Sequence, residues 1–219
     1  MGKLIVIDGS DGSGKTVQTG LLVDALKQHG SVAMFDFPQY DKFFGKFAKR
    51  ALHGEFCDFA HLSPYFASLP YMLDRATVRD DICSALEQGN VVCNRYVSSN
   101  LAHQMGKLSD PEERRALKTF LEHAEFDELK LPRPDCILYL SVPVEISQEL
   151  AAQKNPVKDQ HEENQEHLEA AGQAYRELAA SEPGWVMIDC TPRGKLLLPE
   201  AIHAKVWKIV EPIVASSLL

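Results

Sequence analysis

The octapeptide Gly9-Ser10-Asp11-Gly12-Ser13-Gly14-Lys15-Thr16 follows the apolar run Leu4-Ile5-Val6-Ile7 after a single aspartate. It fills every fixed position of the phosphate-binding loop pattern G-x-x-x-x-G-K-[ST]. The glycines let successive backbone N–H groups wrap a polyphosphate, and the helix expected next presents its positive end to the same anion. In this pattern the lysine reaches the outer phosphates and the threonine hydroxyl binds Mg2+. The octapeptide therefore predicts a nucleoside triphosphate site.

The flanking sequence favours this prediction over the alternative, a glycine-rich turn that carries a surface lysine. The β-branched run before the octapeptide is typical of a buried parallel strand. Leu21, Leu22, Ala25 and Leu26 recur afterwards at helical spacing. A strand, a loop and a helix in this order are the setting that a phosphate-binding loop requires.

Further apolar runs occur at residues 31–37, 91–93, 136–140 and 185–188. With residues 4–7 they predict five short strands, and the helical stretches between them indicate a parallel sheet covered on both faces. Helices are expected near 15–29, 42–53, 64–88, 111–124, 143–153, 160–181 and 197–214. Pro70 is expected to bend the third helix or to delay its start. We predict an α/β, P-loop NTPase-like three-layer fold, in a single domain over 1–219 with a lid insertion at about 151–164.

Composition limits the possible partners. The chain has 219 residues, with 23 Lys and Arg against 31 Asp and Glu, so its formal charge is −8. No global basic field is available to hold nucleic acid or an anionic membrane. The five cysteines form no C-x-x-C pair, which argues against a disulfide framework or a zinc site. No apolar run approaches the roughly 20 residues of a membrane span, and we expect a cytoplasmic protein.

Polar and aromatic residues follow the predicted strands, where the ligands of open parallel sheets collect. The second strand leads into D-F-P-Q-Y at 36–40 and the third into N-R-Y-V-S-S-N at 94–100. Arg95 suits bidentate phosphate binding, and a structural pair with a carboxylate is the alternative. Tyr71 and Arg75 share a helical face, which suits base recognition or a solvated surface contact. Asp159 and Glu162 have the spacing of a capping box, which alone explains both.

Together these motifs resemble those of the thymidylate kinase family in order and spacing. They are G-S-D-G-S-G-K-T at 9–16, F-P-Q-Y at 37–40, Y-M-L-D-R at 71–75, N-R-Y-V-S-S-N at 94–100, L-P-R-P-D at 131–135 and D-Q-H-E at 159–162. The resemblance covers nearly the whole chain. It implies an enzyme that transfers a phosphoryl group from ATP to dTMP with Mg2+, forming dTDP, and that acts as a homodimer.

The resemblance also implies a role for each matching residue. Asp11 would contact the 3′ hydroxyl of the acceptor sugar and lie near the metal's water shell. Tyr40 and Arg95 would hold the acceptor phosphate. His161 and Glu162 would close over the sugar and the metal waters.

The same resemblance assigns residues to the nucleoside. Tyr71 would stack on thymine, and Arg75 would meet an exocyclic oxygen of the base. Asn100 would complete base recognition, and His103 would border the 2′ position. The expected substrate-binding set is completed by Phe37, Pro38 and Ser99.

Transfer between two phosphates needs no strong general base, because the acceptor oxygen is already ionised near neutral pH. Catalysis then rests on positioning and charge neutralisation by Lys15, Arg95, Mg2+ and cations of the lid.

Two positions depart from the family motifs. Asn94 stands where the family commonly has the aspartate of D-R-Y, and Gly12 stands where one family class has an arginine. That class distinction predicts arginines in the lid, but the lid offers Lys154 and Lys158. Lysine lacks the bidentate grip, so we expect a slower chemical step or an arginine recruited from elsewhere. The alternative is that both lysines only solvate an exposed loop.

Two other functions remain open from the sequence. One is a kinase for another nucleotide or deoxynucleoside. The other is a nucleotide-binding regulator without activity, which Asn94 and the absence of arginine from the lid would suit.

Overall fold

The computed structural model describes residues 1–55, 61–154 and 164–215, apart from the side chain of Lys154. Its strands form one parallel sheet in the order β2-β3-β1-β4-β5. They are β1 (Leu4–Asp8), β2 (Val32–Asp36), β3 (Asn90–Asn94), β4 (Cys136–Ser141) and β5 (Trp185–Asp189). β1 is buried along its whole length, as expected for a central strand covered on both faces. The predicted five-stranded parallel sheet is confirmed.

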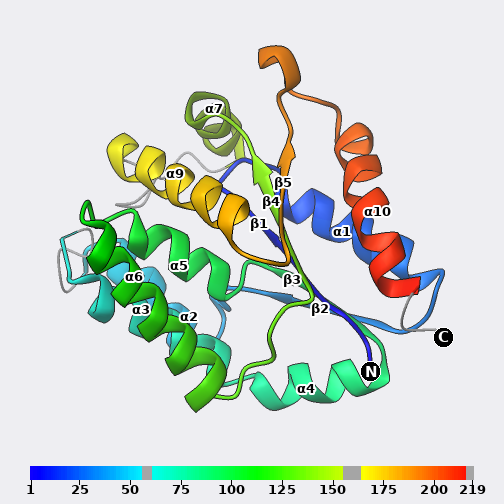
Figure 1. Cartoon of the computed structure of the whole chain (residues 1–219), viewed down its shortest axis with the longest axis horizontal. Helices are drawn as coiled ribbons and strands as arrows, with labels where there is room; N and C mark the ends of the chain where they lie inside the picture. The colour runs from blue at the N-terminus through cyan, green and yellow to red at the C-terminus, as the bar shows by residue number, and fades with distance from the viewer. Residues whose placement is uncertain (56–60, 155–163, 216–219) are drawn as a thin grey trace.

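Helices cover both faces of the sheet (Figure 1). On one face, α1 (Lys15–Lys27) and α10 (Pro199–Ala215) bury Leu22, Leu26 and Val206 against the strands. On the other face the apolar core is formed by α4 (Arg79–Gln88), α5 (Val97–Met105), α6 (Pro111–Glu122) and α9 (Gln165–Ser181). The outer pair α2 (Phe43–Leu52) and α3 (Pro64–Ala76) packs together, and α7 (Val144–Lys154) follows β4. This is the predicted three-layer arrangement.

The strand register brings polar residues together at the carboxyl ends of the strands. Asn94 ends β3, pairing with Ile7 of β1 on one side and with Asp36 of β2 on the other. Asp8 ends β1 beside Tyr139 of β4. Ligands of open parallel sheets bind at this edge, so the register decides which side chains meet a ligand.

The helices differ from the sequence prediction at several points. The stretch 64–88 divides into α3 and α4 at Thr77 and Val78, and Pro70 lies inside α3. The helix α5 was not predicted. α6 continues into a π-helical turn, η1 (His123–Glu128), and the described helix α9 begins at Gln165, after the predicted start at 160.

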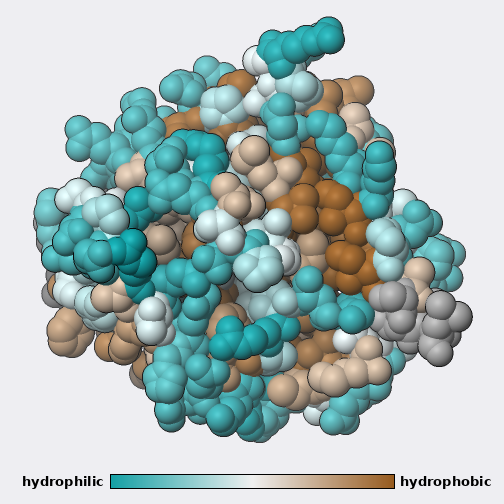
Figure 2. Space-filling model, in the orientation of Figure 1, coloured by the Kyte–Doolittle hydropathy of each residue, from teal (hydrophilic) through white to brown (hydrophobic). Residues whose placement is uncertain are grey.

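Most of the surface seen in Figure 2 is hydrophilic, and hydrophobic surface gathers beside α10. Within the described ranges, the helices lack the combination of length and apolar character that a membrane crossing requires. Cys93, Cys136 and Cys190 are buried free thiols, and burial raises the pKa of Cys136 to about 12.

Candidate active site

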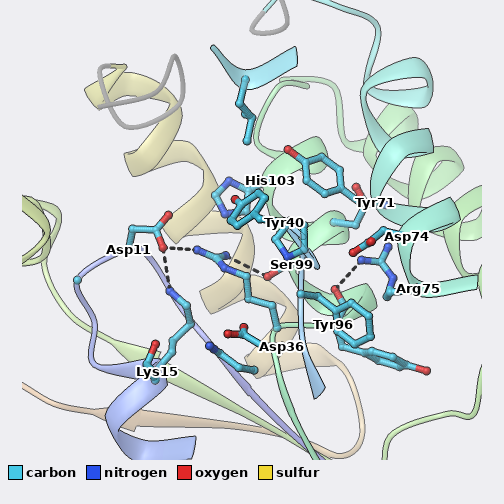
Figure 3. Close-up of a pocket in the computed structure, with 18 of the residues that line it drawn as sticks. Asp11, Lys15, Asp36, Tyr40, Tyr71, Asp74, Arg75, Tyr96, Ser99 and His103 are labelled. Atoms are coloured by element: carbon cyan, nitrogen blue, oxygen red, sulfur yellow. Dashed lines mark hydrogen bonds and ion pairs between the residues drawn. The ribbon is translucent and has the colours of Figure 1, made fainter. Parts of the chain in front are cut away.

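A pocket of about 350 Å³ opens at the carboxyl ends of the strands (Figure 3). It extends from the phosphate-binding loop to α3 and α5. The predicted site residues that line it are Asp11, Gly12, Gly14, Lys15, Thr16, Phe37, Pro38, Tyr40, Tyr71, Arg75, Arg95, Ser99, Asn100 and His103. Segments far apart in the sequence therefore meet in one cavity.

The phosphate-binding loop joins β1 to α1, as predicted, and Lys15 is the first residue of α1. Its Nζ donates to the carbonyl of Ser10 at 2.7 Å and to Asp11 Oδ1 at 3.2 Å. Desolvation and the neighbouring charge of Arg95 lower the pKa of Lys15 to about 8, although Asp11 acts in the opposite direction. Thr16 follows with an exposed side chain at the pocket. The loop thus places one cation and one hydroxyl where the sequence motif requires them.

Gly9 and Ser13 shape the base of this loop and do not belong to the described pocket lining. Gly9 has a φ of +150°, and a Cβ there would lie 2.8 Å from the carbonyl oxygen of Leu140. Ser13 is 3% exposed, and its backbone N–H donates to the carbonyl of Ser10 at 3.1 Å. Gly9 is therefore required where the loop passes close to β4.

Gly12 lies against the backbone of α7. Its φ is +82°, and a Cβ there would lie 1.9 Å from the carbonyl oxygen of Ser147 and 3.0 Å from the backbone nitrogen of Ala151. Any side chain at position 12 would collide with α7, and an L-residue also disfavours this backbone conformation. An arginine at position 12 is incompatible with this arrangement, which gives a physical reason for the glycine.

Arg95 and Asp11 form an ion pair in the pocket. Arg95 follows β3 with a φ of +65°, and its Nη2 donates to Asp11 Oδ1 at 2.5 Å. Desolvation opposes the charged form of Asp11, but Arg95 and Lys15 hold the pKa of its carboxyl well below the ordinary value. Arg95 both pairs with a carboxylate and lines the cavity, so its position suits each of the roles left open by the sequence.

A buried network around Asp8 supports this pair, and sequence reasoning did not find it. Asp8 is fully buried and accepts from the backbone N–H of Gly9 at 2.8 Å, Ser98 Oγ at 2.5 Å, and Ser99 Oγ and the Tyr175 hydroxyl, both at 2.7 Å. Ser99 Oγ also accepts from Arg95 Nη1 at 3.1 Å. The network ties β1 to α5 and α9. The one feature of the local sequence that indicates this network is the aspartate, Asp8, at the end of β1 before the phosphate-binding loop.

Arg75 lies at the other end of the pocket and is locked by a carboxylate that the sequence did not indicate. Its Nε and Nη2 donate to the two oxygens of Glu125, both at 2.6 Å, and Nη1 donates to the carbonyl of Tyr96 at 3.3 Å. The side chains of Arg75 and Glu125 are 3% and 0% exposed. Glu125 also accepts from Asn100 Nδ2 at 3.3 Å. The arginine fork is therefore held in one orientation.

Two buried acceptors lie beside this ion pair. Asn100 Oδ1 and Gln104 Oε1 accept no hydrogen bond from any side chain or backbone group in the described part of the protein. Both residues line the pocket and are 3% and 1% exposed. Buried acceptors of this kind call for a donor, and a ligand can supply it. Sequence reasoning found Asn100 but not Gln104.

A pair of histidines borders the same region. His103 Nδ1 lies 3.3 Å from His167 Nε2, and the rings stack with centroids 5.5 Å apart. His167, from α9, is 9% exposed. Desolvation and the charge of Lys107 lower its pKa to about 4.

The predicted lid residues are described only at their margin. Lys154 is the last residue of α7. The remaining three, Lys158, His161 and Glu162, lie outside the described residues, as does the predicted cap at Asp159. α9 is capped by Asn164, whose side chain accepts from the backbone N–H of His167 at 3.0 Å.

Known proteins resemble this chain over most of its length. The family model described as thymidylate kinase matches residues 7–198, which include the loop and every other motif of the pocket. The chain belongs to the thymidylate kinase family.

Individual members of the thymidylate kinase family match most of the chain. One from Mycobacterium tuberculosis is 35% identical over 190 residues, covering 83% of this chain and 87% of the relative. One from Plasmodium falciparum is 30% identical over 216 residues, covering 97% and 91%. The solved thymidylate kinase of Candida albicans has a TM-score of 0.74 at 22% identity, covering 96% of this chain and 92% of that chain. The last match establishes the common fold.

Proposed function

We propose that this chain phosphorylates dTMP to dTDP with ATP as the donor. The observation that carries the proposal is one pocket that joins a complete phosphate-binding loop to a buried polar region beyond Arg95. The loop suits the triphosphate, and the region around Arg75 and Asn100 suits a base. Membership of the thymidylate kinase family supports thymidylate as the acceptor.

Charge and position carry the chemistry. An acceptor phosphate brings its own ionised oxygen, so the protein has to align it with the donor and offset the charge that develops. Lys15 at the loop and Arg95 at the end of β3 stand on either side of Asp11. When phosphates bind, they offer both cations stronger partners than one shared carboxylate, and Asp11 becomes available to a sugar hydroxyl or a metal-bound water.

The pocket suits Mg2+ bound mainly by phosphate and water. In the described residues, no group of three or more His, Cys, Asp and Glu side chains is arranged to hold a metal ion. Mg2+ keeps several waters and takes few protein ligands in such sites. The Thr16 hydroxyl would bind it directly, with Asp11 acting through water. When bound, Mg2+ neutralises charge on the transferred phosphoryl group.

Base recognition follows from the orphaned acceptors and the locked arginine. Thymine presents one N–H donor between two carbonyl oxygens. Either Asn100 Oδ1 or Gln104 Oε1 can accept from that donor, and Arg75 retains N–H groups on Nη1 and Nη2 for a carbonyl. A base without an N–H at this place would leave a buried acceptor unpaired, which costs about 1–3 kcal/mol.

An ADP-release assay with dTMP, dUMP, dGMP and no acceptor tests this proposal. We expect turnover with dTMP well above that with dGMP and with buffer alone. Faster turnover with another acceptor would mean that dTMP is not the substrate. Binding of ATP and dTMP without turnover would mean that the protein is a nucleotide-binding regulator without activity.

A homodimer is the assembly that the exposed apolar side chains support. α2 and α3 carry several of them, among them Phe43 at 77% and Phe66 at 68% exposure, and α6 carries Phe120 at 37%. Contiguous exposed apolar side chains are typical of protein interfaces. Sedimentation should show a dimer that Phe66→Glu weakens. Leu198→Glu, at an exposed position outside these helices, is the matched control. A cytoplasmic location, as expected from the sequence, completes the proposal.

A further inference from the structure

The end of β3 lacks the carboxylate that phosphate-binding-loop enzymes use near their metal. In these enzymes Mg2+ is held between the loop Ser or Thr and an aspartate on a neighbouring strand. Here the last residue of β3 is Asn94, which lines the pocket and is 6% exposed. Its Oδ1 is buried and accepts no hydrogen bond from the described residues. The amide keeps an acceptor in place but contributes no charge.

Asp36 on the next strand stands directly beside this amide. The two residues are register partners at the ends of β2 and β3, and Asn94 is one of the groups that act to lower the pKa of the Asp36 carboxyl. Asp36 is exposed to the pocket, and Figure 3 shows it on the same side of the cavity as Lys15. Desolvation raises the pKa of its carboxyl, while the charges of Arg95 and Lys15 act in the opposite direction. Asp36 therefore lies within electrostatic reach of both cations.

Each of the other carboxylates of this region makes polar contacts of its own, and Asp11 keeps the water-mediated role toward Mg2+ proposed above. Asp8 accepts four hydrogen bonds, and Asp11 is shared by Lys15 and Arg95. Asp74 accepts from the backbone N–H of Gln39 at 2.8 Å, at the opposite end of the pocket. Within the described pocket lining, Asp36 is the carboxylate that the structure places next to position 94.

We propose that Asp36 supplies the metal-side carboxylate of this active site from β2, and that Asn94 positions it. The proposal rests on the ATP- and Mg2+-dependent function proposed above. Asn94 lies beside Asp36 in the strand register, and its buried Oδ1 would accept from a water of the metal. In related phosphate-binding-loop sites one aspartate supplies both an acceptor and a negative charge. Here Asn94 on β3 would supply the acceptor and Asp36 on β2 the charge.

The test measures how strongly Mg2+ enhances nucleotide binding. A fluorescent, nonhydrolysable ATP analogue is titrated into the full chain with Mg2+ and with EDTA, and the ratio of the two Kd values is the Mg2+-linked gain. We expect Asp36→Asn to reduce this gain by about tenfold, as for other residues that hold metal-bound groups. Its affinity in EDTA should be unchanged. Asp24→Asn, an exposed carboxylate of α1 paired with Lys27, is the matched control and should behave as the unmodified chain.

A charge swap separates the proposed role from a merely structural one. The double variant Asp36→Asn with Asn94→Asp returns the carboxylate to β3 and should recover most of the gain. Equal loss of affinity with Mg2+ and with EDTA, or no recovery in the double variant, would overturn the assignment. So would a full gain in Asp36→Asn. Absence of any Mg2+ effect in the unmodified chain would overturn the proposed function as well, which distinguishes the two failures.

Discussion

Replacing Glu125 should have a large effect on stability, because its charge is buried and paired. Glu125 is fully buried and accepts both charge-assisted bonds from Arg75 at 2.6 Å. Glu125→Met leaves the guanidinium, whose side chain is 3% exposed, without its counter-charge. Breaking one side of a buried ion pair costs about 3–5 kcal/mol. Urea unfolding should show a loss of that size, which corresponds to a fall in Tm of roughly 6–20 °C for a chain of this length.

The double variant Arg75→Met with Glu125→Met distinguishes stability from recognition. Replacing both partners of a buried pair by apolar residues is often nearly neutral for stability, so the double variant should recover most of the loss. It should not recover dTMP binding, because the donors that Arg75 offers to a carbonyl are gone. KM for dTMP is therefore expected to stay raised while KM for ATP changes little. A loss below about 1 kcal/mol for Glu125→Met, the value of an exposed pair, would refute this reasoning.

Three further predictions follow from other residues. Folding lowers the pKa of His167 from 6.5 to about 4, so the unfolded chain binds the proton first and stability is lost as pH falls from 6.5 towards 4. Between pH 7 and pH 5 urea titrations should show a loss of about 2 kcal/mol that His167→Gln lacks. Gly12→Ala should destabilise the protein by about 1 kcal/mol or more, because the added Cβ collides with α7 and the backbone has a positive φ. Gly20→Ala, in open space within α1, is the control and should stabilise the protein by about 0.5–1 kcal/mol. Thermal unfolding measures both. Removal of charge at Lys154 and Lys158 should depress kcat more than ATP affinity, and unchanged turnover in both single variants and the double variant would reject their catalytic role.

The strands and the phosphate-binding loop could be predicted because their signals are local. A buried parallel strand is a short apolar run, and the loop is a fixed pattern of adjacent residues. The starts of α3 at Pro64 and α6 at Pro111 were also signalled, because each follows a capping residue. Only Asp110 makes the side-chain bond, to the backbone N–H of Glu112 at 2.9 Å.

The helix α5 could not be predicted in the same way, because long-range contacts stabilise it. Tyr96 occupies its N-cap position and makes no side-chain capping bond. Its first turn is held by Ser98 and Ser99, which donate to Asp8 from 90 and 91 positions away. A sequence window around residue 97 contains none of this information, so the segment reads as a loop.

The site residues show the same division. Lys15, Arg95, Tyr71 and Asn100 stand in motifs and line the predicted pocket. Glu125 is 50 positions from Arg75 and becomes its partner only because α6 continues into η1 beside α3 and α5. From the sequence alone, the whole guanidinium of Arg75 could bind a base. In the structure Glu125 accepts from Nε and Nη2, so only the remaining N–H groups of Nη1 and Nη2 can do so.

The strand register also changes the meaning of Asn94. Read along the chain, an asparagine in place of aspartate removes a charge and favours a protein that has lost its activity. Neighbouring strands of a sheet lie only about 4.8 Å apart, so residues that end paired strands share one small volume of the active site. Asp36 and Asn94 are such a pair, and a charge lost from one strand end is present on the other. With the role proposed for Asp36, either strand can carry the negative charge on the metal side, so Asn94 by itself does not favour an inactive protein.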